Sequence, residues 1–263
     1  MSQLTLLAAK DISKRFGGLQ ALGDVSFTIN HGEIYGLIGP NGAGKTSLFN
    51  VLTGIYIPDG GSFTFDGEPL DRLKPNDVAE RGIARTFQNI RLFQNLSALE
   101  NVMIGRHVRS KAGVFGAILR DKATLAEEAA IEKRSYELLE YVGVAKRAND
   151  LAKHLAYGDQ RRLEIARALA TEPKLLALDE PAAGMNATET QSLKRLLEDI
   201  RRDGTTILLI EHDMKLVMSV CDRVLVLDYG KKIAEGTAAE VQNDPKVIAA
   251  YLGGEVSLNL KGA

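Results

Sequence analysis

The sequence predicts an α/β protein with a mostly parallel sheet core, an N-terminal antiparallel β part and an inserted helical subdomain. Short, continuous apolar runs, typical of parallel strands that are covered on both faces, occur at 34–38, 175–178, 207–210 and 224–227. A strongly amphipathic segment separates the second run from the third, and alternation of strands with helices indicates a parallel sheet. Between the first two runs, residues 88–170 contain few glycine and β-branched residues, which favours helices there.

The N-terminal quarter is expected to contain short strands. Three segments have the composition of strands: 4–8, 25–29 and 62–65. The last segment ends at Asp66-Gly67, a dipeptide that favours a tight hairpin turn. We therefore expect this part of the chain to be antiparallel.

A buried strand that leads directly into a helix is expected next. The run 34–38 ends at Gly39 and is too short for a helix, so it is interpreted as a strand. The following segment, 45–53, is expected to form a helix that Gly54 ends. Three apolar residues of this segment share one helical face: Leu48, Phe49 and Leu52.

The inserted part is expected to include a helix over residues 121–142. Apolar residues recur there at approximately helical spacing, at Leu125, Ala129, Tyr136 and Leu139. Because no linker rich in Pro, Gly or Ser flanks the helical part, we interpret it as an insertion into the sheet domain.

A second helix is expected between the runs 175–178 and 207–210. Its apolar residues follow the i, i+3, i+4, i+7 pattern, at Leu193, Leu196, Leu197 and Ile200. Thr188 with Gln191 predicts a capping box at its start, and Gly204 predicts its end.

Composition limits the class of protein. The 263 residues are 45% hydrophobic and carry a net charge of −1, so a proper core is expected and a stand-alone nucleic-acid binder is disfavoured. The one cysteine, Cys221, excludes an intrachain disulfide and follows an apolar run, which predicts a small buried hydrophobic residue. No apolar stretch approaches the roughly 18–20 residues that span a bilayer. We expect a protein of the cytoplasm, or one that sits on a membrane without crossing it.

The strongest motif is a glycine-rich loop that matches GxxxxGK[ST]. It lies between the expected strand and the expected helix, where backbone N–H groups and the positive end of the helix can hold phosphates. Lys45 supplies a positive charge to the terminal phosphates, and the Thr46 hydroxyl can bind Mg²⁺. The residues expected to bind nucleotide in this loop are Gly39, Pro40, Asn41, Gly42, Ala43, Gly44, Lys45, Thr46 and Ser47.

Two carboxylates follow the apolar run 175–178. Asp179 is expected at the carboxyl end of a parallel strand, where ligands gather, and there it can hold Mg²⁺ directly or through water. Glu180 comes next and can accept a proton from an attacking water. The phosphate loop and this pair together indicate nucleotide hydrolysis.

With further motifs, the sequence resembles the ATP-binding subunits of ATP-binding cassette (ABC) transporters over about residues 4–252. The segment LAYGDQ at 155–160 resembles the family signature, normally LSGGQ. Gln88 matches the glutamine loop, and 180–186 matches the loop that contacts the second cassette. His212 matches the switch histidine, and Phe16, 23 residues before Gly39, matches the aromatic residue that stacks on adenine.

The resemblance implies a P-loop NTPase domain over residues 4–252, with a helical subdomain at about 88–170 and a short tail at 253–263. It implies ATP and Mg as cofactors, with Mg held by Thr46, Gln88 and Asp179, and catalysis by Glu180, His212 and Gln88. Two cassettes are expected to pair head to tail, so that the signature of one meets the ATP of the other. The signature residues expected there are Ala156, Tyr157, Gly158 and Asp159.

The signature departs from the family pattern. Ala156 replaces a serine whose hydroxyl normally touches the γ-phosphate, Tyr157 replaces a glycine, and Asp159 replaces the glutamine. These changes bear on the strength of the contact with the partner's ATP. Because Glu180 and His212 are both present, we expect hydrolysis.

The signature, the 180–186 loop and the ending VIAAYLG most resemble the branched-chain amino acid importers of bacteria. Alternatives are related systems for lipopolysaccharide export or urea uptake, and soluble ABC ATPases of DNA repair or translation. The resemblance implies a second ATPase subunit (a paralogue or an identical copy), two transmembrane permease subunits, indirectly a solute-binding protein, and no nucleic acid. The expected location is peripheral, on the cytoplasmic face of the inner membrane.

Two segments are candidates for contact with a permease. Residues 89–102 follow the nucleotide-sensing Gln88, and charged residues at Leu92 and Phe93 are expected to uncouple transport while ATP binding survives. The apolar stretch 112–119 could instead lie in the core of the helical subdomain or help to dock a membrane subunit.

Overall fold

The structure is a computed structural model that describes residues 4–70, 72–106, 108 and 122–252. Its N-terminal sheet is antiparallel, with strand order β2-β1-β4-β5. Its strands are β1 (Thr5–Phe16), β2 (Leu19–Asn30), β4 (Gly60–Phe65) and β5 (Glu68–Pro69). Asp66 and Gly67 both have left-handed backbones between β4 and β5, which confirms the predicted hairpin turn.

Across the described residues, the second sheet has six strands in the order β10-β9-β3-β8-β7-β6, and only β10 runs antiparallel to its neighbour. Every residue of β3, β7 and β8 is buried, as expected from their continuous apolar runs. The parallel strands therefore end at one edge, where ligands of α/β proteins bind. The strands are β3 (Ile34–Ile38), β6 (Ile83–Arg85), β7 (Leu175–Asp179), β8 (Thr206–Ile210), β9 (Arg223–Asp228) and β10 (Lys231–Gly236).

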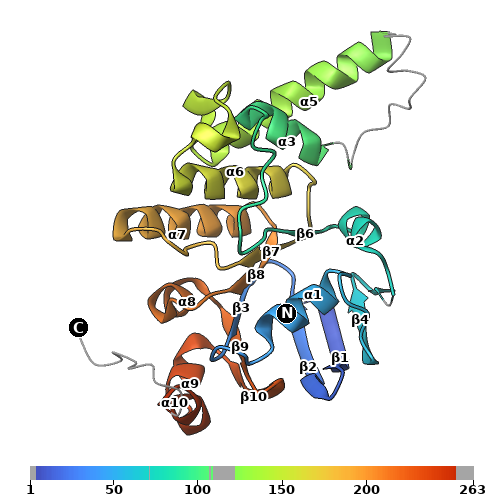
Figure 1. The fold of residues 1–263 in the computed structure, drawn as a ribbon, viewed down its shortest axis with the longest axis vertical. Coiled ribbons are helices and arrows are strands. Elements are labelled where there is room, and N and C mark those ends of the chain that lie inside the picture. The colour runs from blue at the N-terminus through green and yellow to red at the C-terminus, as the bar shows by residue number, and fades with distance from the viewer. Residues whose placement is uncertain (1–3, 71, 107, 109–121, 253–263) are drawn as a thin grey trace.

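Helices surround this sheet (Figure 1). α3, α5 and α6 gather at one end of the molecule and the antiparallel sheet lies at the other. The α-helices are α1 (Lys45–Leu52), α2 (Pro75–Arg81), α3 (Ala98–Arg106), α5 (Lys122–Tyr141), α6 (Tyr157–Leu169), α7 (Ala187–Arg202), α8 (Met214–Val220), α9 (Ala238–Gln242) and α10 (Pro245–Leu252). Two 3₁₀ turns, η2 (Ala145–Arg147) and η3 (Ala152–His154), precede α6. Within the described ranges, none of the helices has the length and apolar character needed to cross a bilayer.

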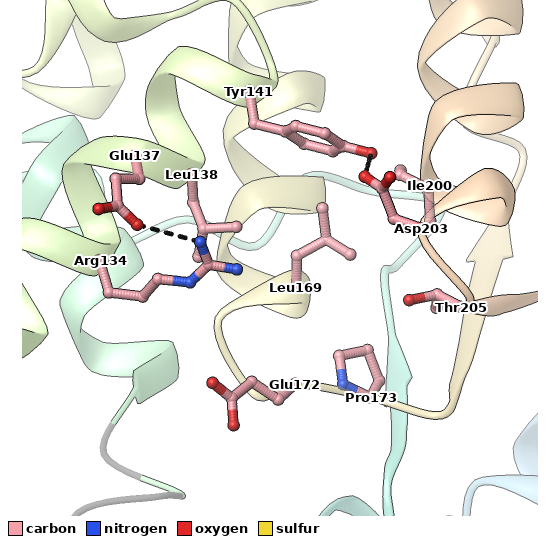
Figure 2. A pocket seen from close by; sticks show the side chains of 10 residues that line it. All are labelled: Arg134, Glu137, Leu138, Tyr141, Leu169, Glu172, Pro173, Ile200, Asp203 and Thr205. Atoms are coloured by element: carbon pink, nitrogen blue, oxygen red, sulfur yellow. Dashed lines mark hydrogen bonds and ion pairs between the residues drawn. The ribbon is translucent and has the colours of Figure 1, made fainter.

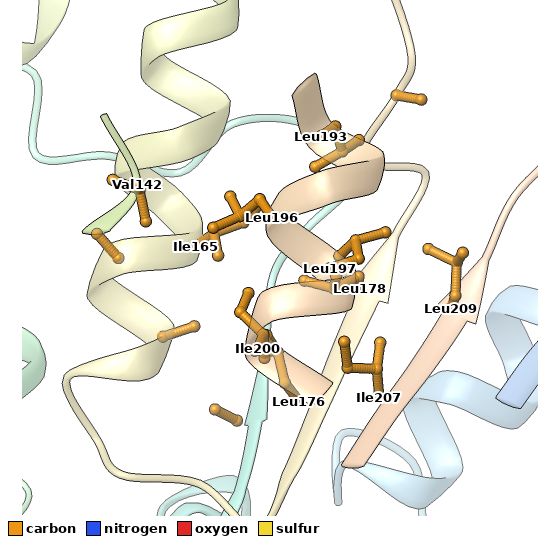
Figure 3. Packing of buried hydrophobic residues seen from close by; sticks show 14 of the residues in the cluster. Val142, Ile165, Leu176, Leu178, Leu193, Leu196, Leu197, Ile200, Ile207 and Leu209 are labelled. Carbon is orange, nitrogen blue, oxygen red and sulfur yellow. The ribbon is translucent and has the colours of Figure 1, made fainter. Parts of the chain in front are cut away.

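The core lies on both faces of the six-stranded sheet. Alternate strand residues face opposite clusters: Leu176 and Leu178 belong to one, and Leu175 and Ala177 to the other. On the first face, α7 and α6 pack on β7 and β8 (Figure 3). The predicted apolar face of α7 is confirmed, since all four of its residues are buried: Leu193, Leu196, Leu197 and Ile200. Cys221 is buried in the same cluster, as predicted.

The start of α7 differs from the prediction. Its cap is Asn186, whose side chain accepts a hydrogen bond from the Glu189 N–H at 3.0 Å. The Glu189 carboxylate accepts one from the Asn186 N–H at 2.9 Å. The predicted capping box of Thr188 with Gln191 is therefore wrong. Asparagine caps a helix as well as threonine does, and Asn186 has a glutamate at the required spacing.

The predicted apolar face of α5 is partly wrong. Leu125, Ala129 and Tyr136 are exposed, whereas Leu139 is buried beside Leu138. The first half of α5 extends past α3 and α6, so no other helix in the part of the chain that the structure describes covers it (Figure 1). The apolar stretch 112–119 and the tail 253–263 lie outside the described residues.

Candidate active site

The phosphate loop connects β3 to α1. Gly42 and Gly44 have left-handed backbones, and Gly44 directly precedes the helix. At Gly39, a Cβ would lie 2.2 Å from the Leu227 carbonyl oxygen, so only glycine fits against the end of β9. The loop therefore presents backbone N–H groups and the N-terminus of α1 at the carboxyl edge of the sheet, an arrangement that suits an anion.

Lys45 is folded over this loop. Its Nζ donates to the carbonyl oxygens of Gly39 at 2.7 Å and Pro40 at 2.9 Å. Burial lowers the pKa of Lys45, while the charges of Glu180 and Asp179 act in the opposite direction. The ammonium is thus held near Glu180, the predicted catalytic base, and Asp179, a predicted Mg²⁺ ligand, where it can meet a phosphate.

A hollow of about 290 Å³ opens beside the loop. It joins Phe16 to residues 42–47 and includes Tyr229 and Gly230. The Phe16 ring is partly exposed and meets Tyr56 edge to face, with 5.1 Å between ring centroids. The structure thus brings the aromatic residue predicted to stack on adenine to the predicted phosphate site, with space between them.

Glu180 lies at the centre of a polar cluster. Gln88 Nε2 donates to its Oε2 at 2.8 Å, and His212 Nε2 contacts its Oε1 in a short hydrogen bond. Glu180 has a left-handed backbone with φ of 50°, and its N–H donates to the Ile210 carbonyl oxygen at 2.9 Å. Because Gln88, Glu180 and His212 follow β6, β7 and β8, the parallel sheet brings the three predicted catalytic residues together.

Asp179 is the last residue of β7 and is buried. Burial raises its pKa most, the charge of Glu180 raises it further, and Arg85 opposes both. Within the described ranges, no group of three or more His, Cys, Asp or Glu side chains could hold a metal ion. The predicted donors Thr46, Gln88 and Asp179 are hard oxygen ligands. They fit Mg²⁺, which binds one or two carboxylates and takes further ligands from phosphates and water.

Comparison with known proteins agrees with this geometry. Residues 22–183 match the family model described as "ABC transporter", and residues 231–257 match "Branched-chain amino acid ATP-binding cassette transporter". The high-affinity branched-chain amino acid transport ATP-binding protein LivG of Salmonella typhimurium is 48% identical over 96% of this chain and 99% of its own length. The chain belongs to the ABC transporter family. As an ABC ATPase, it hydrolyses ATP.

Solved structures of ABC cassettes have the same fold. The ADP conformation of MJ1267, an ATP-binding cassette of an ABC transporter, aligns with a TM-score of 0.83 at 31% identity, over 95% of this chain and 99% of that one. A dimeric post-hydrolysis state of the cassette MJ0796, bound to ADP and Pi, aligns with a TM-score of 0.76 at 25% identity, over 89% and 99%. The predicted fold class is therefore confirmed.

The signature of this ABC ATPase lies at the start of α6. Ala156 is the helix cap and Tyr157 is exposed, while Gly158 is buried against the Glu189 side chain. The structure describes all of residues 156–159, and none of them lines the hollow beside the phosphate loop. The signature and the phosphate loop of one chain thus do not share a ligand pocket.

Sequence reasoning missed Arg161, which ties the signature helix to the glutamine loop. Its guanidinium donates to the carbonyl oxygens of Phe87, at 2.8 Å, and Gln88, and to the Tyr157 hydroxyl at 2.9 Å. The residue is 4% exposed and pairs with the buried Glu164. No pattern in a single sequence indicates the contacts of Arg161 with Phe87 and Gln88, which lie more than 70 residues away.

Glu211 was also missed. Its carboxylate accepts hydrogen bonds from the Ala182 N–H at 2.7 Å and the His212 N–H at 3.1 Å. Burial raises its pKa, and these backbone hydrogen bonds oppose the rise. Glu211 therefore joins the loop after Glu180 to the loop that carries His212. An acid next to the switch histidine at a strand end was the available signal.

A second hollow, of about 360 Å³, lies between α5, α6 and α7 (Figure 2). Within it the Tyr141 hydroxyl donates to Asp203 at 2.7 Å, and Arg134 pairs with Glu137 at 3.1 Å. None of the predicted site residues lines this hollow, so it is separate from the ABC ATPase site.

Proposed function

We propose that this chain is the ATPase subunit of a bacterial importer for branched-chain amino acids. The observation that carries the ATPase part is the convergence of Gln88 and His212 on Glu180, beside the phosphate loop. The match of residues 231–257 to the branched-chain family model and the identity to LivG support this cargo over lipopolysaccharide or urea.

In this proposal, Glu180 accepts a proton from the water that attacks the γ-phosphate. Lys45 and the backbone N–H groups of residues 41–47 hold the phosphates, and Phe16 stacks on adenine. Thr46, Gln88 and Asp179 would hold Mg²⁺, which supplies positive charge to the phosphates. In the structure, Gln88 and His212 bind Glu180. We propose that they move to the γ-phosphate side when ATP enters, which frees the Glu180 carboxylate for the water.

A second ATPase subunit, either identical or a paralogue, would complete the site. The first turn of α6 presents the exposed Ala156 and Tyr157, followed by Gly158 and Asp159, away from the chain's own nucleotide hollow. The dimeric MJ0796 cassette with ADP and Pi supports an arrangement of two cassettes. The N-terminal N–H groups of α6 would then meet the γ-phosphate bound by the partner.

Of the two permease subunits, one would dock on a largely apolar groove of about 410 Å³ on this chain. It is lined by Phe87, beside the glutamine loop, and by Phe93, Ile104 and Val108 of the helical part. Phe93 is 50% exposed, but Leu92 is 8% exposed and belongs to the core. The prediction that Leu92 lies on the docking surface is therefore wrong, and Phe93 remains a candidate.

This groove would place the subunit on the cytoplasmic face of the membrane, with a solute-binding protein linked only through the permeases. We further propose that residues 4–252 form one ATP-binding domain, with the helical subdomain inserted at about 88–170.

The test is Glu180→Gln in the complete transporter. We expect ATP turnover to fall by ~10²–10⁴-fold, the usual contribution of a general base, because an amide cannot accept the proton. Binding of MgATP is expected to survive. Turnover at the wild-type rate would contradict the role of Glu180. A second test is a pull-down from native membranes through a tag on this chain. If no permease subunits were recovered with the chain, the transport assignment would be contradicted.

A further inference from the structure

The turn between β9 and β10 lies against the phosphate loop for a topological reason. β9 pairs with β3 in parallel, so the two strands end side by side. β3 continues into the phosphate loop, and β9 continues into Tyr229-Gly230. The Gly230 N–H donates to the Ala43 carbonyl oxygen at 2.9 Å, so the turn is bonded directly to the loop.

Tyr229 is an unusual residue for this turn. Tyr229 and Gly230 have φ of 42° and 75° and connect two antiparallel strands, which defines a tight hairpin turn that favours Asn-Gly. Among the described residues, no other aromatic residue has a left-handed backbone conformation. Tyr229 is 87% exposed, so packing against the described residues does not offset the strain. Strained backbones of this kind cluster at active sites and ligand sites.

The position of Tyr229 indicates which ligand it meets. It lines the same hollow as Phe16 and residues 42–47. We propose that Tyr229 is a nucleotide-binding residue, whose ring packs on the adenosine part of the nucleotide and forms a second aromatic wall beside Phe16. An aromatic ring suits this task because every base has a π face on which it can stack. The inference rests on the proposed nucleotide site.

The test uses calorimetric binding of ADP and of pyrophosphate to the full chain, since neither ligand requires hydrolysis. Tyr229→Asn removes the ring and supplies a residue that the turn favours. We expect this variant to bind ADP about 5- to 20-fold more weakly, within the range for one base–aromatic contact. Binding of pyrophosphate, which lacks adenosine, is expected to remain unchanged. Tyr229→Phe is expected to bind ADP within about twofold of wild type, because the ring is kept.

Thermal unfolding without nucleotide controls for folding, and Tyr229→Asn is expected to be at least as stable as wild type. Unchanged ADP affinity in Tyr229→Asn would overturn the proposal. Equal weakening of ADP and pyrophosphate would also overturn it, because the residue would then act through the phosphate loop. The variant Lys45→Ala distinguishes failure of the Tyr229 proposal from failure of the nucleotide site. If this variant bound both ADP and pyrophosphate as wild type does, the nucleotide site itself would be overturned.

Discussion

Replacing Arg161 with methionine is expected to destabilise the protein and to slow ATP turnover. The side chain is 4% exposed, and its removal leaves the carbonyl oxygens of Phe87 and Gln88 without this donor. Glu164 loses one of its two arginine partners but keeps Arg167, at 3.8 Å. Breaking a buried ion pair by removing one partner costs about 3–5 kcal/mol.

At about 2–4 °C per kcal/mol for a chain of this size, Arg161→Met is expected to lower the melting temperature by roughly 6–20 °C. Turnover per folded molecule is also expected to fall, because the backbone of Gln88 loses its anchor and its side chain binds Glu180. The assays are thermal unfolding followed by two probes, and ATP hydrolysis at a temperature where the variant is folded.

Arg162→Met is the matched control on the same helix. Arg162 donates to the Val142 carbonyl oxygen at 3.1 Å and to the Ser192 hydroxyl at 2.8 Å, so it does not touch the glutamine loop. We expect a loss of about 0.5–1.5 kcal/mol per hydrogen bond and unchanged turnover. Equal stability and equal turnover in the Arg161 and Arg162 variants would refute the reasoning.

Three further predictions test particular contacts. Phe93→Asp is expected to abolish transport and keep ATP binding, whereas Leu92→Asp is expected to unfold the helical part; transport by the Phe93 variant would exclude it from the docking surface. Cys221 is buried and burial raises the pKa of its thiol, so a thiol reagent at pH 8 is expected to label it only in denaturant; rapid labelling of the folded protein would contradict this. Asn186→Ala is expected to cost about 0.5–2 kcal/mol of unfolding free energy, and Thr188→Ala less than about 0.5; the reverse order would restore the Thr188 cap.

Local chemistry explains what the sequence predicts well. The strand 34–38 and the start of the following helix at Lys45 agree with the prediction to the residue, because apolar runs and glycines act over a few positions. The convergence of Glu180 and His212 was predictable only through the resemblance to a family.

Burial and long-range contacts account for what was missed. Leu92 and Phe93 are adjacent and both apolar, yet only one is covered by the fold. The predicted strand over 25–29 is part of β2 (Leu19–Asn30), because the ladder with β1 continues through polar residues at its edges. The sequence does not single out Tyr229, because its left-handed backbone and its place beside the phosphate loop are properties of the fold.

Uptake of radiolabelled leucine into vesicles that contain the reconstituted transporter tests the central claim most directly. With ATP on the side of this subunit, wild type is expected to accumulate leucine, and the variant Glu180→Gln is expected to accumulate none above the level without ATP. Leucine uptake that proceeds equally with Glu180→Gln would contradict the claim that this chain drives the transport of branched-chain amino acids through Glu180.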